Sequence, residues 1–326
     1  MLPAWWLNSP LWAVTVARKI IIDTDPGQDD AVAILLAFAS PELEVLGITA
    51  VAGNVPLSLT QKNALIVCEL ARRSDTKVFA GCAAPLSRKL VTAEHVHGKT
   101  GLDGPDLPDP TMSLQDGHAV DFIVETLLNE PSKTVTLCPL GPLTNIANAL
   151  LKEPDIAPRI QQIVLMGGGY FEGGNITPAA EFNIYVDPEA ADIVMKSGVD
   201  IVMMPLDVTH KALVTKARND AFRALGTPVG VAVAQMTDFF ERFDREKYGS
   251  DGAPLHDPTV IAYLLLPELF TGRHINVEIE TASNLTLGMT VADWWRVSGR
   301  RANVTFMGGI DADGFFNLLT DRLARL

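Results

Sequence analysis

The sequence predicts an α/β fold, with a doubly wound, mostly parallel, Rossmann-like sheet in a single domain. Short apolar runs rich in β-branched residues alternate along the chain with amphipathic, helix-like stretches, which is typical of βαβ units. Hydrophobic residues make up 48% of the 326 residues, as suits strands covered by helices on both faces. No internal repeat or linker-like composition divides the sequence.

Buried strands are predicted at residues 19–22, 45–50, 135–137, 163–166 and 201–204. Helices, whose apolar residues recur at intervals of three and four, are predicted at residues 29–39, 57–73, 119–128, 145–150 and 188–196. Residues 82–110 are rich in Gly, Pro, Asp and His and are predicted to form a long loop. Because such sheets bind ligands beyond the carboxyl ends of their strands, we expect the active-site loops there.

Composition narrows the class of partner. The net charge of −13 predicts repulsion from nucleic acid and anionic membranes, so we expect neither as a partner and favour a small-molecule substrate. The cysteines Cys68, Cys82 and Cys138 form no Cys-x-x-Cys pair, which argues against a disulfide framework or a zinc ribbon and favours the cytoplasm. Residues 1–18 are predicted to be an N-terminal extension and a candidate for disorder, with the folded domain at 19–326.

An acidic motif follows the first predicted strand. The sequence D-T-D-P-G-Q-D-D at residues 23–30 places four carboxylates at a strand-to-helix turn. Helix capping accounts for one or two of them, whereas four repel one another unless a cation neutralises them. A hard divalent metal ion is therefore predicted. The spacing does not fit an EF-hand, since its fifth, sixth and twelfth positions hold Gly27, Gln28 and Ile34. A phosphatase with Asp23 as nucleophile remains open on this motif.

Four further segments accompany the acidic motif: A-G-N at 52–54, H-G-K-T-G-L-D-G at 97–104, A-E-F-N-I-Y-V-D-P-E-A at 180–190 and L-H-D-P at 255–258. Together they resemble the inosine-uridine preferring nucleoside hydrolases, over about residues 19–326. The resemblance implies calcium-dependent hydrolysis of the N-glycosidic bond of ribonucleosides, by a cytoplasmic tetramer or dimer in pyrimidine salvage and nucleoside catabolism. Residues 248–249 with 252–258, and residues 288–293, look more like the pyrimidine-preferring branch, which acts on uridine and cytidine. The alternatives are a purine or broad-specificity hydrolase and a non-catalytic nucleoside-binding protein.

The resemblance also implies roles for individual residues. The Ca²⁺ ligands would be Asp25, Asp30, Asp257 and the backbone carbonyl of Leu140. Asp25 would also be the general base that takes a proton from the attacking water. His256 would be a second catalytic residue, in contact with the nucleobase. The other substrate-binding residues implied are Asp29, Asn54, His97, Met166, Asn175, Glu181, Phe182, Asn183 and Tyr248.

Overall fold

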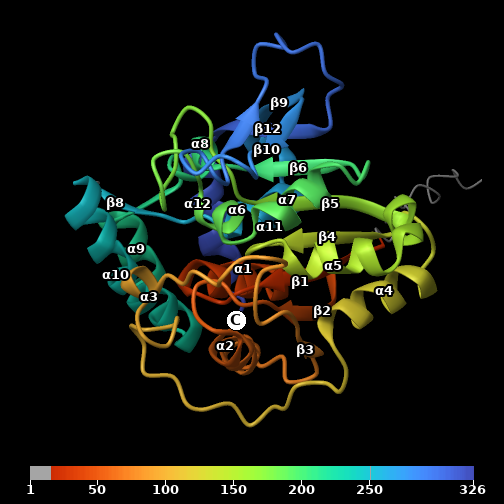
Figure 1. Cartoon of the computed structure of the whole chain (residues 1–326). Coiled ribbons are helices and arrows are strands. Elements are labelled where there is room, and N and C mark those ends of the chain that lie inside the picture. Colours follow the sequence, from red (N-terminus) through yellow and green to blue (C-terminus); the bar gives the residue numbers. More distant parts are fainter. Residues whose placement is uncertain (1–15, 250) are drawn as a thin grey trace, which may run out of the picture.

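The computed structural model describes residues 16–249 and 251–326, apart from the side chains of residues 243–245, 247 and 248. An eight-stranded sheet runs through its centre in the order β3-β2-β1-β4-β5-β6-β12-β9. Its strands are parallel except β9, which pairs antiparallel with β12 at one edge. Helices cover both faces of this sheet (Figure 1). The predicted doubly wound, mostly parallel fold is confirmed.

The strands of the sheet are β1 (Arg18–Thr24), β2 (Leu43–Ala50), β3 (Val78–Ala80), β4 (Val135–Pro139), β5 (Ile160–Met166), β6 (Ile201–Met204), β9 (Phe270–Ile275) and β12 (Val304–Ile310). Five of them contain the predicted runs. Alternate residues of β1 face opposite sides, so Ile20 and Ile22 join one hydrophobic core while Ile21 joins the other. Burial on both faces explains why these strands appear in the sequence as continuous apolar runs.

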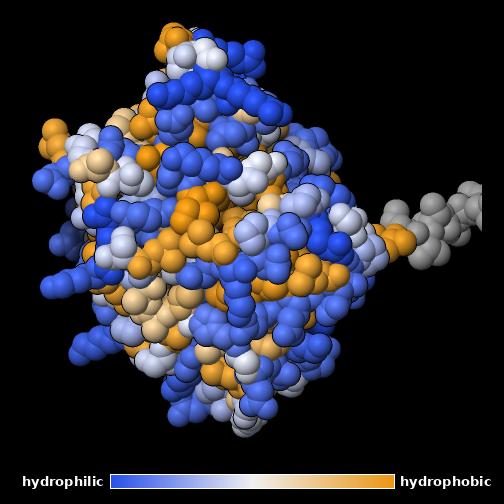
Figure 2. Space-filling view, turned by 45° about the vertical axis from the view of Figure 1, so that its right-hand side comes forward, coloured by the Kyte–Doolittle hydropathy of each residue, from blue (hydrophilic) through white to orange (hydrophobic). Residues whose placement is uncertain are grey.

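Two helical layers complete the two cores. One layer includes α1 (Gln28–Phe38), α2 (Leu57–Leu70), α11 (Pro258–Leu265) and α12 (Ala312–Leu323). The other includes α4 (Ala119–Asn129), α5 (Thr144–Lys152) and α7 (Pro188–Met195). Hydrophilic residues cover much of the face in Figure 2, with hydrophobic residues visible in patches between them. Within the described residues, no helix is both long and apolar enough to cross a membrane.

The remaining helices are α3 (Glu94–His97), α6 (Phe182–Val186), α8 (Leu206–Thr209), α9 (Lys216–Ala224) and α10 (Pro228–Tyr248), with 3-10 turns at Pro154–Arg159 and Pro267–Leu269. The stretch 82–110, predicted to be a loop, contains the short helix α3. Two small antiparallel ribbons pair β7 (Leu213–Thr215) with β8 (Gly252–Pro254), and β10 (Val277–Ile279) with β11 (Thr290–Ala292). Most of the predicted N-terminal extension, residues 1–15, lies outside the described residues, and β1 begins at Arg18.

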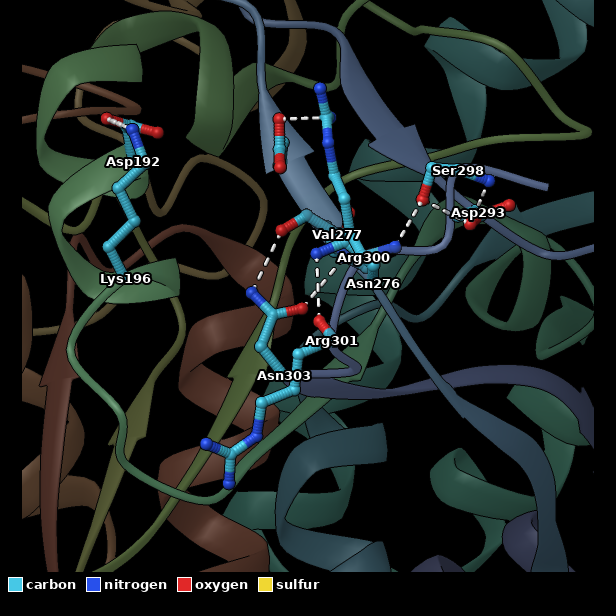
Figure 3. Close-up of polar contacts among 10 residues, drawn as sticks. Asp192, Lys196, Asn276, Val277, Asp293, Ser298, Arg300, Arg301 and Asn303 are labelled. Carbon is cyan, nitrogen blue, oxygen red and sulfur yellow. Dashed lines mark hydrogen bonds and ion pairs between the residues drawn. The ribbon is translucent and has the colours of Figure 1, made fainter. Parts of the chain in front are cut away.

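The β10–β11 ribbon supports the turn that follows β5. Asn303 fixes the ribbon by donating from Nδ2 to the carbonyl of Met195 at 2.9 Å and to that of Val277 at 2.9 Å, the second of which is drawn in Figure 3. On β11, the hydroxyl of Thr290 lies so close to Gly168 that a Cβ there would be 2.7 Å from Oγ1. Gly168 also has a φ of +81°, which a side chain rarely adopts. The ribbon therefore requires glycine in this turn.

Candidate active site

Three buried carboxylates meet at the carboxyl end of β1. Asp29 and Asp30 lie in the first turn of α1, and Asp257 comes directly before α11. One oxygen from each lies within 4.8 Å of the others. The contact between α1 and α11 brings Asp257 to residues more than two hundred positions earlier in the chain. This group could hold a metal ion.

Asp25 lies beside this group in a narrow slot. Its Oδ2 accepts a hydrogen bond of 2.7 Å from the backbone N–H of Asn54. A Cβ at Gly53 would be 2.0 Å from Oδ2, and a Cβ at Gly141 would be 2.0 Å from Oδ1. Both glycines are therefore required by close approach, one on each side of the carboxylate. Asp25 is 1% exposed and has little freedom to turn.

Hydrogen bonds also fix Asp30. Thr24 Oγ1 donates to its Oδ1 at 2.5 Å, and the backbone N–H of Gly27 donates to its Oδ2 at 2.9 Å. The amide of Asn54 donates both to the carbonyl of Asp25, at 3.1 Å, and to Oδ2 of Asp30, at 3.2 Å. Asn54 thus joins Asp25 to the group of three.

Burial raises the pKa of all four carboxyls, and repulsion between the acids adds to the effect for Asp25, Asp29 and Asp257. Burial and then the charge of Asp30 raise the pKa of Asp29 to about 8. The pKa values of Asp25 and Asp257 are raised well above their ordinary value, by burial first and then by the neighbouring aspartates. A pocket lies beside these carboxyls, and among the described residues no Lys or Arg lines it. Ionised together these carboxylates would repel one another, so the site favours a bound cation, and its oxygen ligands suit a hard divalent ion.

A second wall of the pocket comes from the segments after β4 and β5. Asn183 Nδ2 donates to the carbonyl of Leu140 at 2.7 Å and to that of Met166 at 3.3 Å. Glu181 accepts from the backbone N–H groups of Gly168 and Asn183, both at 2.9 Å. Burial raises the pKa of Glu181 to about 7 despite these donors. Amide and carboxyl groups thus converge on one end of the pocket.

Histidines and Phe240 form the other end. Nδ1 of His256 lies 2.8 Å from Oγ1 of Thr209, and Nδ1 of His97 lies 2.8 Å from Oε1 of Gln28. Burial, with smaller effects from His210 and His97, lowers the pKa of His256 well below its ordinary value. Burial lowers the pKa of His97 to about 3. Both rings are therefore neutral near pH 7 and offer a hydrogen-bond donor and acceptor rather than a charge.

Most residues singled out from the sequence line this one pocket: Asp29, Asn54, His97, Leu140, Met166, Asn175, Glu181, Phe182, Asn183, His256 and Asp257. Asp25 and Asp30 lie beside it, in the acid cluster. The side chain of Tyr248 lies outside the described residues. Sequence reasoning missed Ala93, His95, Val96, Ile176, His210 and Phe240. His210 follows β6 by six residues, so its place after a strand end was the available signal.

Asp23 has a structural position. It is fully buried and does not line the described pockets. Its Oδ1 accepts from Thr49 Oγ1 at 2.6 Å and from Asn145 Nδ2 at 2.7 Å. These bonds join β1 to β2 and α5. Enclosed in this way, Asp23 has no access to a phosphate ester, which removes the support for a phosphatase.

A family model described as inosine-uridine preferring nucleoside hydrolase matches residues 20–317. The chain belongs to this family. A pyrimidine-specific ribonucleoside hydrolase, RihA, from Shewanella sp. (strain ANA-3) is 51% identical over 310 residues, covering 95% of this chain and 97% of the relative. An uncharacterised protein of Schizosaccharomyces pombe is 54% identical over 308 residues, covering 94% and 99%.

Solved structures agree with this assignment. The purine-preferring ribonucleoside hydrolase from Gardnerella vaginalis superposes on this nucleoside hydrolase with a TM-score of 0.88 at 35% identity, covering 94% of this chain and 98% of that one. The protein is an enzyme, a hydrolase that acts on N-glycosyl compounds. The resemblance predicted from the acidic motif and its accompanying segments is confirmed.

Proposed function

We propose that this nucleoside hydrolase cleaves pyrimidine ribonucleosides, uridine and cytidine, to ribose and the free base in a Ca²⁺-dependent reaction. The observation that carries the proposal is a buried acid cluster below a two-ended pocket. One end of the pocket offers the amide and carboxyl groups of Asn183 and Glu181, which suit ribose hydroxyls. The other end offers neutral imidazoles and the Phe240 ring, which suit a planar base.

The donor set fits calcium, which binds carboxylate and carbonyl oxygens. Asp25, Asp30, Asp257 and the carbonyl of Leu140 would hold the ion. That carbonyl accepts a hydrogen bond from Asn183 and retains a second lone pair. Asp29 lies within the same group of three, so its carboxylate would serve the ion or a ribose hydroxyl. When bound, the cation would neutralise the cluster and lower the pKa of a water molecule.

Asp25 would act as the general base. Its carboxylate is held by Asn54 and enclosed by two glycines, so it takes a proton from water in one fixed geometry. That water attacks the anomeric carbon while the bond to the base breaks. The electron pair of the broken bond leaves with the base.

Groups of this chain would stabilise the sugar as it gains positive charge. Asn54, Asn175, Asn183 and the carboxyl of Glu181 would bind the ribose hydroxyls, and nearby anionic oxygens favour an oxocarbenium-like transition state. Met166 and Phe182 would pack on the apolar side of the sugar. These side chains line the pocket beside the acid cluster.

The departing base would lie at the histidine end. His256, oriented by Thr209, would contact it and assist its departure, with His97 and Tyr248 as further substrate-binding residues. The pyrimidine preference is supported by the relative named pyrimidine-specific, at 51% identity. The structural neighbour named purine-preferring is more distant, at 35% identity.

A comparison of substrates tests this proposal. We expect kcat/KM for uridine and cytidine to exceed that for inosine when Ca²⁺ is present. A value for inosine ten times that for uridine, about 1.4 kcal/mol of transition-state preference, would favour the purine or broad-specificity alternative. Substituting Mg²⁺ for Ca²⁺ after chelation tests the identity of the ion, and equal rates with both would contradict a specific need for calcium.

A further inference from the structure

One pocket-lining side chain has no role in the reaction described above. His210 follows α8 and lies on the pocket wall, with its ring centroid 5.8 Å from that of His256. Its Nδ1 lies 3.1 Å from Oε2 of Glu172. Glu172 belongs to the segment after β5, and His210 to the segment after β6. Because β5 and β6 are parallel neighbours, their carboxyl ends bring these two segments together.

The two segments are fastened to each other by several bonds. Asp207 accepts from the backbone N–H groups of Tyr170, at 2.8 Å, and Phe171, at 2.7 Å. The backbone N–H of Leu206 donates to the carbonyl of Gly168 at 2.9 Å. These contacts hold the backbone just before Glu172 against α8, the helix that His210 follows. The Glu172 carboxylate therefore meets His210 from a fixed backbone, although the glutamate side chain itself is 43% exposed.

The chemistry of this pair decides which ring nitrogen remains for a ligand. A carboxylate accepts hydrogen bonds, so this contact calls for the His210 tautomer that carries its hydrogen on Nδ1. In that tautomer Nε2 carries no hydrogen, so it is the ring nitrogen that can accept a hydrogen bond from a ligand. The preceding residue, Thr209, orients His256 in a similar way. Thr209, the last residue of α8, thus orients the imidazole of His256, and the next residue, His210, provides a second imidazole at the same end of the pocket.

We propose that His210 is a nucleobase-contacting residue that contributes to base specificity, and that Glu172 is the residue that positions its ring. The inference rests on the proposed function, since it assigns the histidine end of the pocket to the base. It deepens that proposal by naming a second imidazole, with Nε2 directed at the polar edge of a pyrimidine. His210 acts by contact and hydrogen bonding, and no bond to it is made or broken.

The test compares two ribosides in the Ca²⁺-loaded enzyme. Uridine carries a base with a polar edge, whereas 4-nitrophenyl riboside has a good leaving group without the ring nitrogens of a base. His210→Phe keeps a planar ring and removes both nitrogens. We expect kcat/KM for uridine to fall by at least about tenfold, and that for the nitrophenyl riboside to change by less than about threefold. His274→Phe is the matched control, because His274 lies on the edge strand β9 and contacts Thr305; both ribosides should be unaffected.

Variants of Glu172 test the positioning role. Glu172→Gln keeps an acceptor for Nδ1 and should stay within about threefold of wild type on uridine. Glu172→Ala should show a loss on uridine similar to that of His210→Phe. The double variant should be no worse than His210→Phe alone, because the two residues act as one unit. Additive losses would show that Glu172 does not act through His210.

The remaining outcomes separate this inference from the proposed function. Equal losses on both ribosides in His210→Phe would make His210 a structural residue and overturn the inference. An unchanged uridine rate in that variant would overturn it as well. In both cases the wild-type enzyme still cleaves uridine, so the proposed function stands. A wild-type enzyme that releases ribose from neither riboside would instead refute the proposed function.

Discussion

Replacing Gly141 with Ala should displace the proposed general base without changing any catalytic group. A Cβ at residue 141 would be 2.0 Å from Oδ1 of Asp25, whereas ordinary contact begins at 3.4 Å. The carboxylate must therefore move by about 1.4 Å, the difference between these two distances. Gly53 closes the opposite side of the slot, so the displaced side chain has no free space there. A shift of about 1 Å at a reacting group can cost about 10²-fold in rate.

We therefore expect Gly141→Ala to lower kcat/KM for uridine by at least about 10²-fold, roughly 2.7 kcal/mol of transition-state stabilisation. Steady-state release of ribose gives the rate, and circular dichroism with a thermal melt establishes that the variant is folded. Gly308→Ala is the matched control, because its Cβ would meet only the side chain of Trp294, at 3.1 Å. A folded Gly141→Ala enzyme within threefold of wild type would refute the idea that the position of Asp25 limits the reaction.

Further predictions concern the acid cluster. Asp25→Asn should lower kcat by ~10²–10⁴-fold in saturating Ca²⁺, as for loss of a general base, and a near-normal kcat would show that another group takes the proton. Metal-free protein should lose stability as pH rises from about 4 towards 8. The pKa of Asp29 is about 8 in the folded state against an ordinary 3.8. Over this pH range the folded protein therefore keeps a proton that the unfolded chain releases. Added Ca²⁺ should raise the melting temperature more at pH 8 than at pH 5, since the ion needs ionised carboxylates. Thermal melts measure both effects. A Ca²⁺-induced shift in melting temperature that does not depend on pH would contradict the assignment of these carboxylates as calcium ligands.

Much of the fold follows from local sequence patterns. The five predicted strands are buried on both faces, so their apolar runs are nearly uninterrupted and easy to recognise. The edge strand β9 was not predicted, because four of its six residues are exposed and its pattern is weak. The strand β12 contains Gly308 and Gly309 near its end, residues that reduce strand propensity. Where burial does not mark a strand, its pairing depends on partners distant in the chain.

The site was predicted less completely, for a geometric reason. The motif at residues 23–30 indicates a cation site, yet its spacing does not show which carboxylates face one point. In the structure Asp29 joins Asp30 and Asp257, while Asp25 occupies a separate slot beside them. That arrangement depends on the packing of α11 on α1. His210 was missed because its position in the pocket depends on the pairing of β5 with β6, which no short motif encodes.

The central claim is that the acid cluster and the pocket above it hydrolyse a ribonucleoside. The most direct measurement is chromatographic quantification of uracil and ribose released from uridine in phosphate-free buffer, before and after removal of divalent metal. We predict equimolar uracil and ribose with Ca²⁺ present, loss of both products on chelation, and recovery when Ca²⁺ is restored. Undiminished product formation by rigorously metal-free enzyme, or release of uracil that requires added phosphate, would contradict this account.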